Sequence, residues 1–221
     1  MNTLHRLLAL PVLALTVATT HAGTFADINL VDGGFSDWSG VVASATNTGT
    51  GPIQQIFIAN NDTHLFVRIT FNTNINIVSD GFRMNIDSDN NTGTGFNTFF
   101  ATLGATIGSE LLYEGEFAYQ QASGNYNTGA TTNAPLLIGA YNESVTSVEF
   151  GIVRTAVSNT ANSTLVFPND TFKLAVYFGD DATSFNAAEY TFATSQIPEP
   201  ATFAGLAGMG ALTLAFFRRR R

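Results

Sequence analysis

The stretch Leu65-Phe66-Val67-Arg68-Ile69-Thr70-Phe71 decides the fold class. Every second side chain from Leu65 to Phe71 is apolar, and successive side chains of an extended chain point to opposite faces. The stretch therefore predicts a β-strand with one face in a hydrophobic core. The same period of two recurs at 82–86 and 172–178, so two further strands of this kind are expected.

Weaker strand signals surround these three, and turn sequences such as Asn60-Asn61-Asp62 separate them. The weaker strand signals lie at 27–31, 53–59, 110–113, 116–120, 136–141, 147–153 and 188–193. A short turn near 154–161 is the one helical signal. No linker or charge block interrupts residues 23–195. The pattern predicts one all-β domain, a jelly-roll-like β-sandwich.

The first 22 residues have the composition of a signal peptide. Arg6 precedes an apolar run from Leu7 to Val17, and small residues lead up to Ala22. A run of about 11 residues reaches only about half way across a hydrocarbon core. We expect residues 1–22 to be a signal peptide that is cleaved after Ala22. The alternative is an uncleaved membrane anchor.

Residues 196–221 form a second targeting segment with three parts. Pro198-Glu199-Pro200 comes first, residues 201–217 carry no charge, and Arg218–Arg221 end the chain. A helix over 201–217 would be about 26 Å long, which is the short limit for a transmembrane helix. The arginines favour the cytoplasmic side, so this helix would cross the inner membrane and leave the body outside it.

This tripartite tail resembles the PEP-CTERM sorting signal of Gram-negative bacteria. The resemblance implies that exosortase, a membrane-embedded transpeptidase-like enzyme, cleaves near Pro198-Glu199-Pro200. The body would then pass to the cell surface or to the exopolysaccharide matrix, as a secreted component of the cell envelope. The alternative is a plain bitopic anchor that is never processed.

Composition excludes several classes of function. The chain has no cysteine, which removes disulfides, thiolate catalysis and cysteine-based zinc sites. The formal net charge is −8, but five of the nine basic residues lie near the two ends. Between Asp27 and Glu189, four basic residues face sixteen acidic ones. Such a body offers nucleic acid no basic surface, and we expect no nucleic-acid partner.

Three motifs of the body occur in a recognisable order. They are Asp32-Gly33-Gly34-Phe35-Ser36-Asp37-Trp38, then Asn60-Asn61-Asp62-Thr63-His64-Leu65-Phe66-Val67-Arg68, then Asp87-Ser88-Asp89-Asn90-Asn91-Thr92-Gly93. Over residues 28–95 the chain resembles the family 9 carbohydrate-binding-module-like fold, which is related to DOMON-type domains. The resemblance implies a jelly-roll-like sandwich and a role in binding carbohydrate.

The acidic loop is a candidate calcium site. Asp87, Asp89 and Asn91 follow one another at alternate positions, so their oxygens can converge on one hard cation, as in the first half of an EF-hand loop. The twelfth position is Thr98 and carries no carboxylate, so a complete site would need carboxylates or carbonyls from elsewhere in the chain, for which Glu149 and Asp32 are candidates. The alternative is a turn without metal, in which Asp and Asn bind their own backbone.

A sugar site would need exposed aromatic side chains. The single tryptophan, Trp38, belongs to the opening motif and is expected to plug one end of the sandwich. Tyr119 and Tyr126 are the candidates for stacking on a sugar, with Gln120 as a hydrogen-bonding neighbour. The alternative is that Tyr119 packs with its hydroxyl group at the surface.

Arg68 and Arg83 are candidates for binding an anionic sugar, because the body holds so few cations. If 64–71 and 81–87 pair as a hairpin, both arginines project from the face opposite Leu65. The alternative is that each pairs with an acidic residue such as Glu116 or Glu149.

Catalysis is not expected. His64 is the one histidine left after signal removal, and no nucleophilic serine motif accompanies it. Glu110, Glu114 and Glu116 are close enough in sequence to leave a polysaccharide hydrolase as the least favoured class. The sequence thus predicts a non-catalytic surface or matrix protein that binds extracellular polysaccharide. The alternative is a structural surface protein with no specific glycan ligand.

Overall fold

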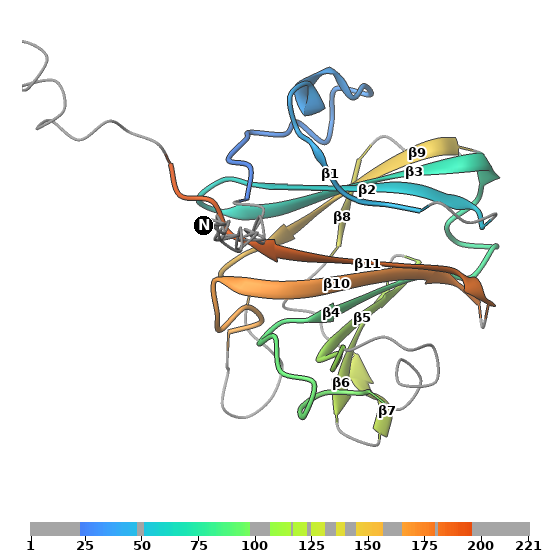
Figure 1. Ribbon diagram of the computed structural model, residues 1–221, viewed down its shortest axis with the longest axis vertical. Helices are drawn as coiled ribbons and strands as arrows, with labels where there is room; N and C mark the ends of the chain where they lie inside the picture. The colour runs from blue at the N-terminus through green and yellow to red at the C-terminus, as the bar shows by residue number, and fades with distance from the viewer. Residues whose placement is uncertain are drawn as a thin grey trace, which may run out of the picture.

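The computed structural model shows a β-sandwich, which confirms the predicted all-β fold (Figure 1). It describes residues 23–47, 51–97, 107–115, 117–122, 125–130, 136–139, 145–156, 165–179 and 181–195. The expected signal peptide and sorting tail lie outside these residues. In the part of the chain that is described, no helix is long and apolar enough to span a bilayer.

The described residues form two antiparallel sheets and one short 3-10 helix, η1 (Ser36–Trp38). The first sheet has the order β1-β2-β3-β9-β8 and the second has the order β11-β10-β4-β5-β6-β7. The strands are β1 (Ala43–Thr46), β2 (Ile53–Asn60), β3 (His64–Ile75), β4 (Phe82–Asp87), β5 (Leu111–Glu114), β6 (Phe117–Ala122), β7 (Asn125–Ala130), β8 (Leu137–Ile138), β9 (Val145–Val153), β10 (Thr171–Phe178) and β11 (Asp181–Thr191).

The hairpin considered for residues 64–71 and 81–87 does not form. β3 pairs with β2 and β9, whereas β4 pairs with β5 and β10 in the other sheet. The segment 76–81 therefore crosses from one sheet to the other. As a result, Arg68 and Arg83 lie in different sheets and do not share a face.

The core lies between the sheets and is built from the alternating side chains that predict the strands. Leu65, Val67 and Ile69 of β3 are fully buried in it, as are Phe172 and other apolar residues of β10. Phe82 of β4 stacks on Phe150 of β9, with ring centroids 5.3 Å apart. The two sheets are thus in direct contact through aromatic rings.

The weaker strand signals agree with the structure only in part. The signal at 27–31 is wrong, because this segment is a loop there. Of the signal at 136–141, residues 136–139 are described and contain β8, while the last two residues lie outside the described part. β1 and β7 are strands that the analysis missed. Residues 154–156 form a turn, and the rest of the expected helical turn lies outside the described residues.

The opening motif covers the outer face of the five-stranded sheet (Figure 1). Trp38 is buried there with Ile28 and Val41, against Ala59 of β2 and Phe66 of β3. Ala59 and Phe66 belong to the face opposite the core. Trp38 therefore seals a sheet face and does not plug an end of the sandwich, because its apolar partners lie on that face.

Candidate functional site

A groove opens beside the start of β4. It has a volume of about 240 Å³ and is lined by Val78, Gly81, Phe82, Arg83, Glu114, Gly115 and Phe117. Two turns build it: the β3–β4 crossing with Gly81 and the β5–β6 turn with Gly115. Both glycines have positive φ, 71° and 57°, which other residues rarely adopt. The sequence therefore fixes the tight turns that shape the groove.

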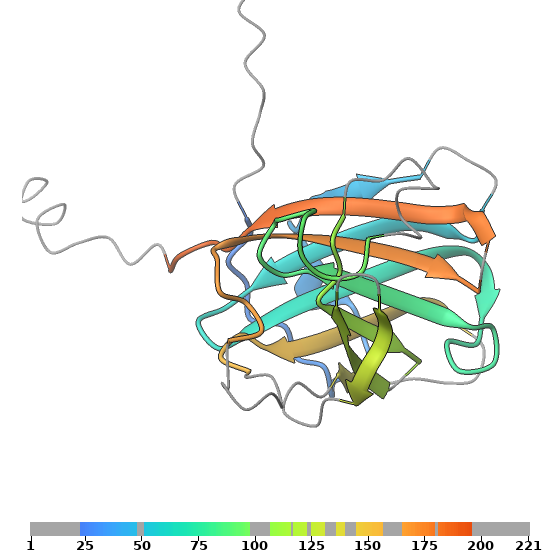
Figure 2. The ribbon, with the colours of Figure 1, turned by 90° about the horizontal axis from the view of Figure 1, so that it is seen from below.

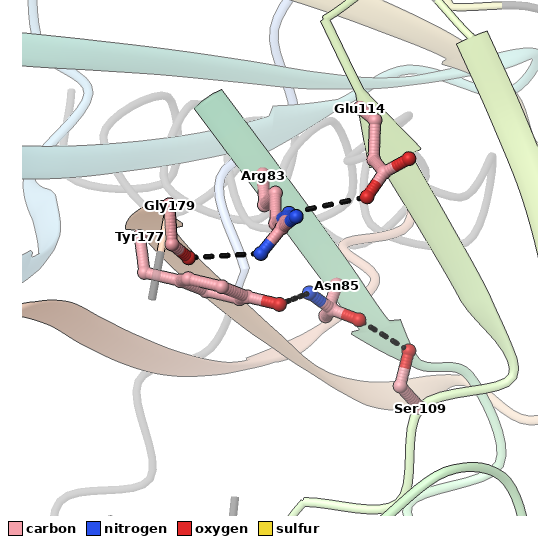
Figure 3. Close-up of polar contacts among 6 residues, drawn as sticks. All are labelled: Arg83, Asn85, Ser109, Glu114, Tyr177 and Gly179. Carbon is pink, nitrogen blue, oxygen red and sulfur yellow. Dashed lines mark hydrogen bonds and ion pairs between the residues drawn. The ribbon is translucent and has the colours of Figure 1, made fainter. Parts of the chain in front are cut away.

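An ion pair forms the polar wall of the groove (Figure 3). Arg83 Nε donates to Glu114 Oε1 at 3.1 Å, across the β4–β5 ladder. Arg83 Nη1 also donates to the carbonyl oxygen of Gly179 at 2.9 Å. Both charged side chains keep about a quarter of their surface exposed, 27% and 28%. They are thus held in place yet still reach solvent, and their charges largely cancel.

Buried polar side chains lie beside this wall, further along β4 (Figure 3). Asn85 donates to the Tyr177 hydroxyl at 3.2 Å and accepts from the Ser109 hydroxyl at 2.9 Å. Asn85 is fully buried, and the Tyr177 ring also lies 5.9 Å from the Arg83 guanidinium carbon. Because buried polar groups need their partners, these hydrogen bonds hold the Tyr177 ring in its place beside Arg83.

The apolar walls of the groove are exposed to solvent. Phe117 keeps 61% of its surface exposed and Val78 keeps 62%. Phe117 pairs with Glu114 in the β5–β6 register, so its ring shares the outer face of the sheet with the ion pair. An exposed aromatic ring beside a fixed donor and acceptor is the arrangement that a sugar site requires.

The structure places some of the sugar-site residues predicted from the sequence on the face of the groove and others elsewhere. Tyr119 is two residues from Phe117 along β6 and shares its face with it, half-buried. Gln120 is opposite Leu111, a core residue, and therefore faces the other way. Tyr126 lies in β7, but its side chain is outside the described part of the structure. Arg83 and Tyr119 are thus brought to one face, whereas Gln120 is not.

Arg68 lies in the other sheet, where it packs against aromatic rings and donates a hydrogen bond within the protein. Its guanidinium carbon lies 4.3 Å from the ring centroid of Phe35 and 5.5 Å from that of Phe57. Arg68 Nε donates to Ser147 Oγ at 2.9 Å. Burial lowers the pKa of Arg68, and the nearby carboxylate of Glu149 opposes this effect. Arg68 therefore lies opposite Glu149 across the β3–β9 ladder and stacks under the opening motif.

Glu149 is itself a buried carboxyl group. It is 2% exposed, and its Oε2 accepts a hydrogen bond of 2.8 Å from Trp38 Nε1. Burial raises the pKa of Glu149. Gly139 leaves room for this side chain, since a Cβ at Gly139 would lie 2.4 Å from Glu149 Cγ. Glu149 therefore ties the opening motif to β9, in the sheet that does not carry the acidic loop, and is not part of the acidic cluster.

The acidic loop does bring carboxylates together. Asp87 and Asp89 are joined by Glu110, and one oxygen from each lies within 4.8 Å of the others. Asp87 is fully buried and accepts backbone hydrogen bonds from Asn91 and Gly108, both 3.0 Å long. Burial raises the pKa of Asp87, and it raises that of Glu110 to about 7. Glu110 is the acidic residue that the sequence analysis missed.

The donor set partly fits a calcium ion. Within the described residues, Glu110 Oε1 is buried and accepts no hydrogen bond, which leaves one carboxylate oxygen available. Asn91 turns its Oδ1 to the backbone N–H of Gly93 instead. Asp32, the other residue expected to complete the site, caps the N–H of Gly34 in the opening motif. The three carboxylates would therefore be the main ligands.

The glutamates considered for catalysis are separated. Glu110 belongs to the acidic cluster and Glu114 to the ion pair with Arg83, and Glu116 is outside the described residues. His64 contacts the Thr63 hydroxyl at 2.8 Å and stacks on Phe66, 5.7 Å between ring centroids. Each of the described groups is thus accounted for by a structural contact.

Comparison with known proteins identifies the tail. Residues 196–221 match the PEP-CTERM protein-sorting motif, which confirms the resemblance seen in the sequence. The chain therefore carries a sorting signal of this kind. No curated protein matches the chain.

Similar solved structures include a family 9 carbohydrate-binding module from Caldicellulosiruptor kristjanssonii. In complex with cellotriose it is 12% identical, with a TM-score of 0.43 over 80% of this chain and 96% of the module. In complex with glucose it is 12% identical, with a TM-score of 0.42 over 81% of this chain and 98% of the module. These modules belong to the family that the body's motifs resemble, and their sugars are ligands of those proteins.

Proposed function

We propose that the protein is exported and sorted through its PEP-CTERM tail, and that its sandwich binds carbohydrate without catalysis. Exosortase processes the precursor near Pro198-Glu199-Pro200 and passes the body to the cell surface or to the exopolysaccharide matrix. The tail match supports the sorting part of this proposal. The groove at Arg83, Glu114 and Phe117 supports the binding part.

The chemistry of the groove favours one neutral sugar ring. Phe117 offers an exposed ring for the C–H face of a pyranose, while Arg83 supplies donors and Glu114 supplies acceptors for sugar hydroxyl groups. Because the ion pair cancels most of the charge, the groove does not select an anionic sugar. Its volume, about 240 Å³, is below that of sites for drug-sized ligands, so a terminal sugar unit of a polysaccharide fits best.

A glycan array with the processed protein tests the binding part. We expect binding to a subset of neutral glycans, and loss of that binding in Phe117→Ala with an unchanged melting temperature, since the side chain is largely exposed. Leu165→Ala is the matched control, because Leu165 is also exposed (51%) but lies outside the groove. An array without any signal would favour the alternative, a structural surface protein.

The sorting part has a separate test. The Glu199→Ala precursor should stay uncut in cells that contain exosortase, while the unaltered chain loses its tail. The readout is the mass of the protein recovered from the cell surface. The same processed mass in both would overturn this part and leave the binding part intact.

We propose in addition that calcium occupies the acidic cluster as a structural ion. Asp87, Asp89 and Glu110 would hold it, and Asn91 lies in the same loop. The unpartnered oxygen of Glu110 supports this assignment. A calcium ion would offset most of the negative charge of the three acids and fix the loop to the β4–β5 ladder.

A further inference from the structure

Both ends of the body are fastened at one place. At the N-terminal end, Asn60 N donates to Thr24 O at 3.0 Å, and Ala26 N donates to Asn60 O at 2.9 Å. At the C-terminal end, Ala193 N donates to Asn60 Oδ1 at 2.8 Å, and Asn60 Nδ2 donates to Ala193 O at 2.9 Å. Asn60 therefore holds the segment that follows the signal peptide beside the segment that precedes the tail.

The groove lies at the opposite end of the sandwich. β10 begins at Thr171, which pairs with Thr191, and ends at Phe178, which pairs with Phe82 beside the groove. β3 likewise runs from the Asn60 end to the 76–81 crossing, and its 12 residues span about 35 Å. Figures 1 and 2 show the start of the described chain and the end of β11 on one side, and the β10–β11 hairpin on the other.

The tether to the membrane is short. From Ala193, the last residue held by Asn60, five residues lead to Pro198, a reach of about 17 Å at most. Eight residues lead to Ala201, where the uncharged stretch begins, a reach of about 28 Å. These reaches are shorter than the body is long, so the point of exit limits how the body can turn.

We propose that the membrane-bound precursor holds the sandwich end-on. The tail-exit end, formed by Asn60–Asp62, Arg154, Asp170 and Phe192, faces the bilayer, and the groove faces away from it. Exosortase then works in the gap beneath the tail-exit end, while the groove is free to meet extracellular glycans. This inference rests on the proposed membrane-anchored sorting.

The charge of the tail-exit end indicates that the short chain, and not attraction to the lipid surface, holds this end near the bilayer. Asp62 and Asp170 are exposed there, while Arg154 donates to Asn61 O at 2.8 Å and lies 4.1 Å from the ring centroid of Phe192. Exposed carboxylates are repelled by anionic lipid. The orientation is therefore set by the short chain, and lengthening the chain should abolish it.

Energy transfer to lipid tests the orientation, and the absence of cysteine makes labelling simple. Two full-length precursors, Asp62→Cys and Ser79→Cys, each receive a donor dye on the new cysteine, and both positions are exposed. Each precursor is then inserted into vesicles of phosphatidylethanolamine and phosphatidylglycerol whose headgroups carry an acceptor dye. We expect transfer from position 62 to exceed that from position 79 by about threefold, because the two ends of β3 differ in height by about 35 Å. Equal or reversed transfer would overturn the end-on arrangement.

Two controls separate this result from a failure of the proposed sorting. Flotation shows whether each precursor is bound to the vesicles; a precursor that does not float contradicts the membrane anchor itself, and the orientation with it. A flexible insert of about 30 Gly and Ser residues after Ser195 should bring the two transfer values together. If the difference persists with the insert, something other than the short tether orients the body, and the proposal is wrong.

Discussion

The Tyr190 hydroxyl lies 2.8 Å from Asn60 Oδ1, and both residues are buried. The same hydroxyl accepts a hydrogen bond of 3.0 Å from Thr24 N. One side chain of β11 therefore contacts the end of β2 and the entering N-terminal segment at once. Together with the Asn60–Ala193 bonds, this contact closes the body at the point where its tail leaves.

Asn60→Ala should lower the free energy of unfolding by about 3 kcal/mol. The change removes the partner of the part-buried N–H and C=O of Ala193 and one partner of the buried Tyr190 hydroxyl, and an unpaired buried group costs about 1–3 kcal/mol. Urea denaturation measures the effect. Asn72→Ala is the control, because Asn72 is exposed and its side chain donates to Gly51 O; a loss of the same size in both variants would contradict the role of Asn60.

Glu149 should give the protein a pH-dependent stability. Because its pKa is raised by burial, the folded protein keeps this proton to higher pH than the unfolded chain. The stabilisation is complete below the ordinary value of 4.5 and is lost as the pH rises through the raised pKa. Glu149→Gln cannot titrate, so its stability relative to the unaltered protein should increase with pH. Melting temperatures of both proteins from pH 4 to 8 check this, and parallel curves would contradict it.

Calcium should stabilise the protein through the acidic cluster. At about 100 times Kd, calcium should add about 2.7 kcal/mol to the free energy of unfolding, and EDTA should remove it. Glu110→Gln should lose most of this response, because Glu110 is the member of the described acidic cluster that has a buried carboxylate oxygen without a hydrogen-bond partner. Glu114→Gln is the matched control, since Glu114 is bound to Arg83 and lies outside the cluster. Equal melting temperatures with calcium and with EDTA would refute the proposal.

Strands with strict alternation could be predicted from the sequence, and others could not, for physical reasons. β1 reads Ala-Ser-Ala-Thr and carries little apolar surface, so its pairing with β2 comes from backbone hydrogen bonds at an edge. Residues 27–31 alternate like a strand, but Ile28 is apolar because it covers the outer face with Trp38. An alternating pattern indicates which side chains are buried. A loop that covers a sheet buries its apolar side chains just as a strand does, so the pattern does not distinguish the two.

The candidate sites could not be predicted from local sequence patterns, because their composition depends on which strands pair. Asp87 and Asp89 were visible as a motif, but Glu110 joins them only because β4 pairs with β5 and sets Ile86 opposite Leu111. The two prominent arginines looked equivalent, yet the 76–81 crossing sends β3 and β4 to different sheets. Sheet pairing therefore decided which candidates could act together.

The two arginines should separate stability from binding. Arg68→Ala removes stacking on Phe35 and Phe57 and should cost about 2 kcal/mol of stability. It should leave the affinity for the glycan found on the array unchanged, because Arg68 belongs to the other sheet. Arg83→Ala should weaken that affinity by about tenfold, or about 1.4 kcal/mol, since it removes the donors of the groove.

Arg83→Lys sharpens this comparison. Lysine keeps the charge but lacks the fork that contacts Glu114 and Gly179 together, so most of the affinity should still be lost if geometry matters more than charge. Calorimetric titration with the glycan and urea denaturation of the same samples give both quantities. If Arg68→Ala lowers the affinity as much as Arg83→Ala does, the ligand does not bind in the groove at Phe117.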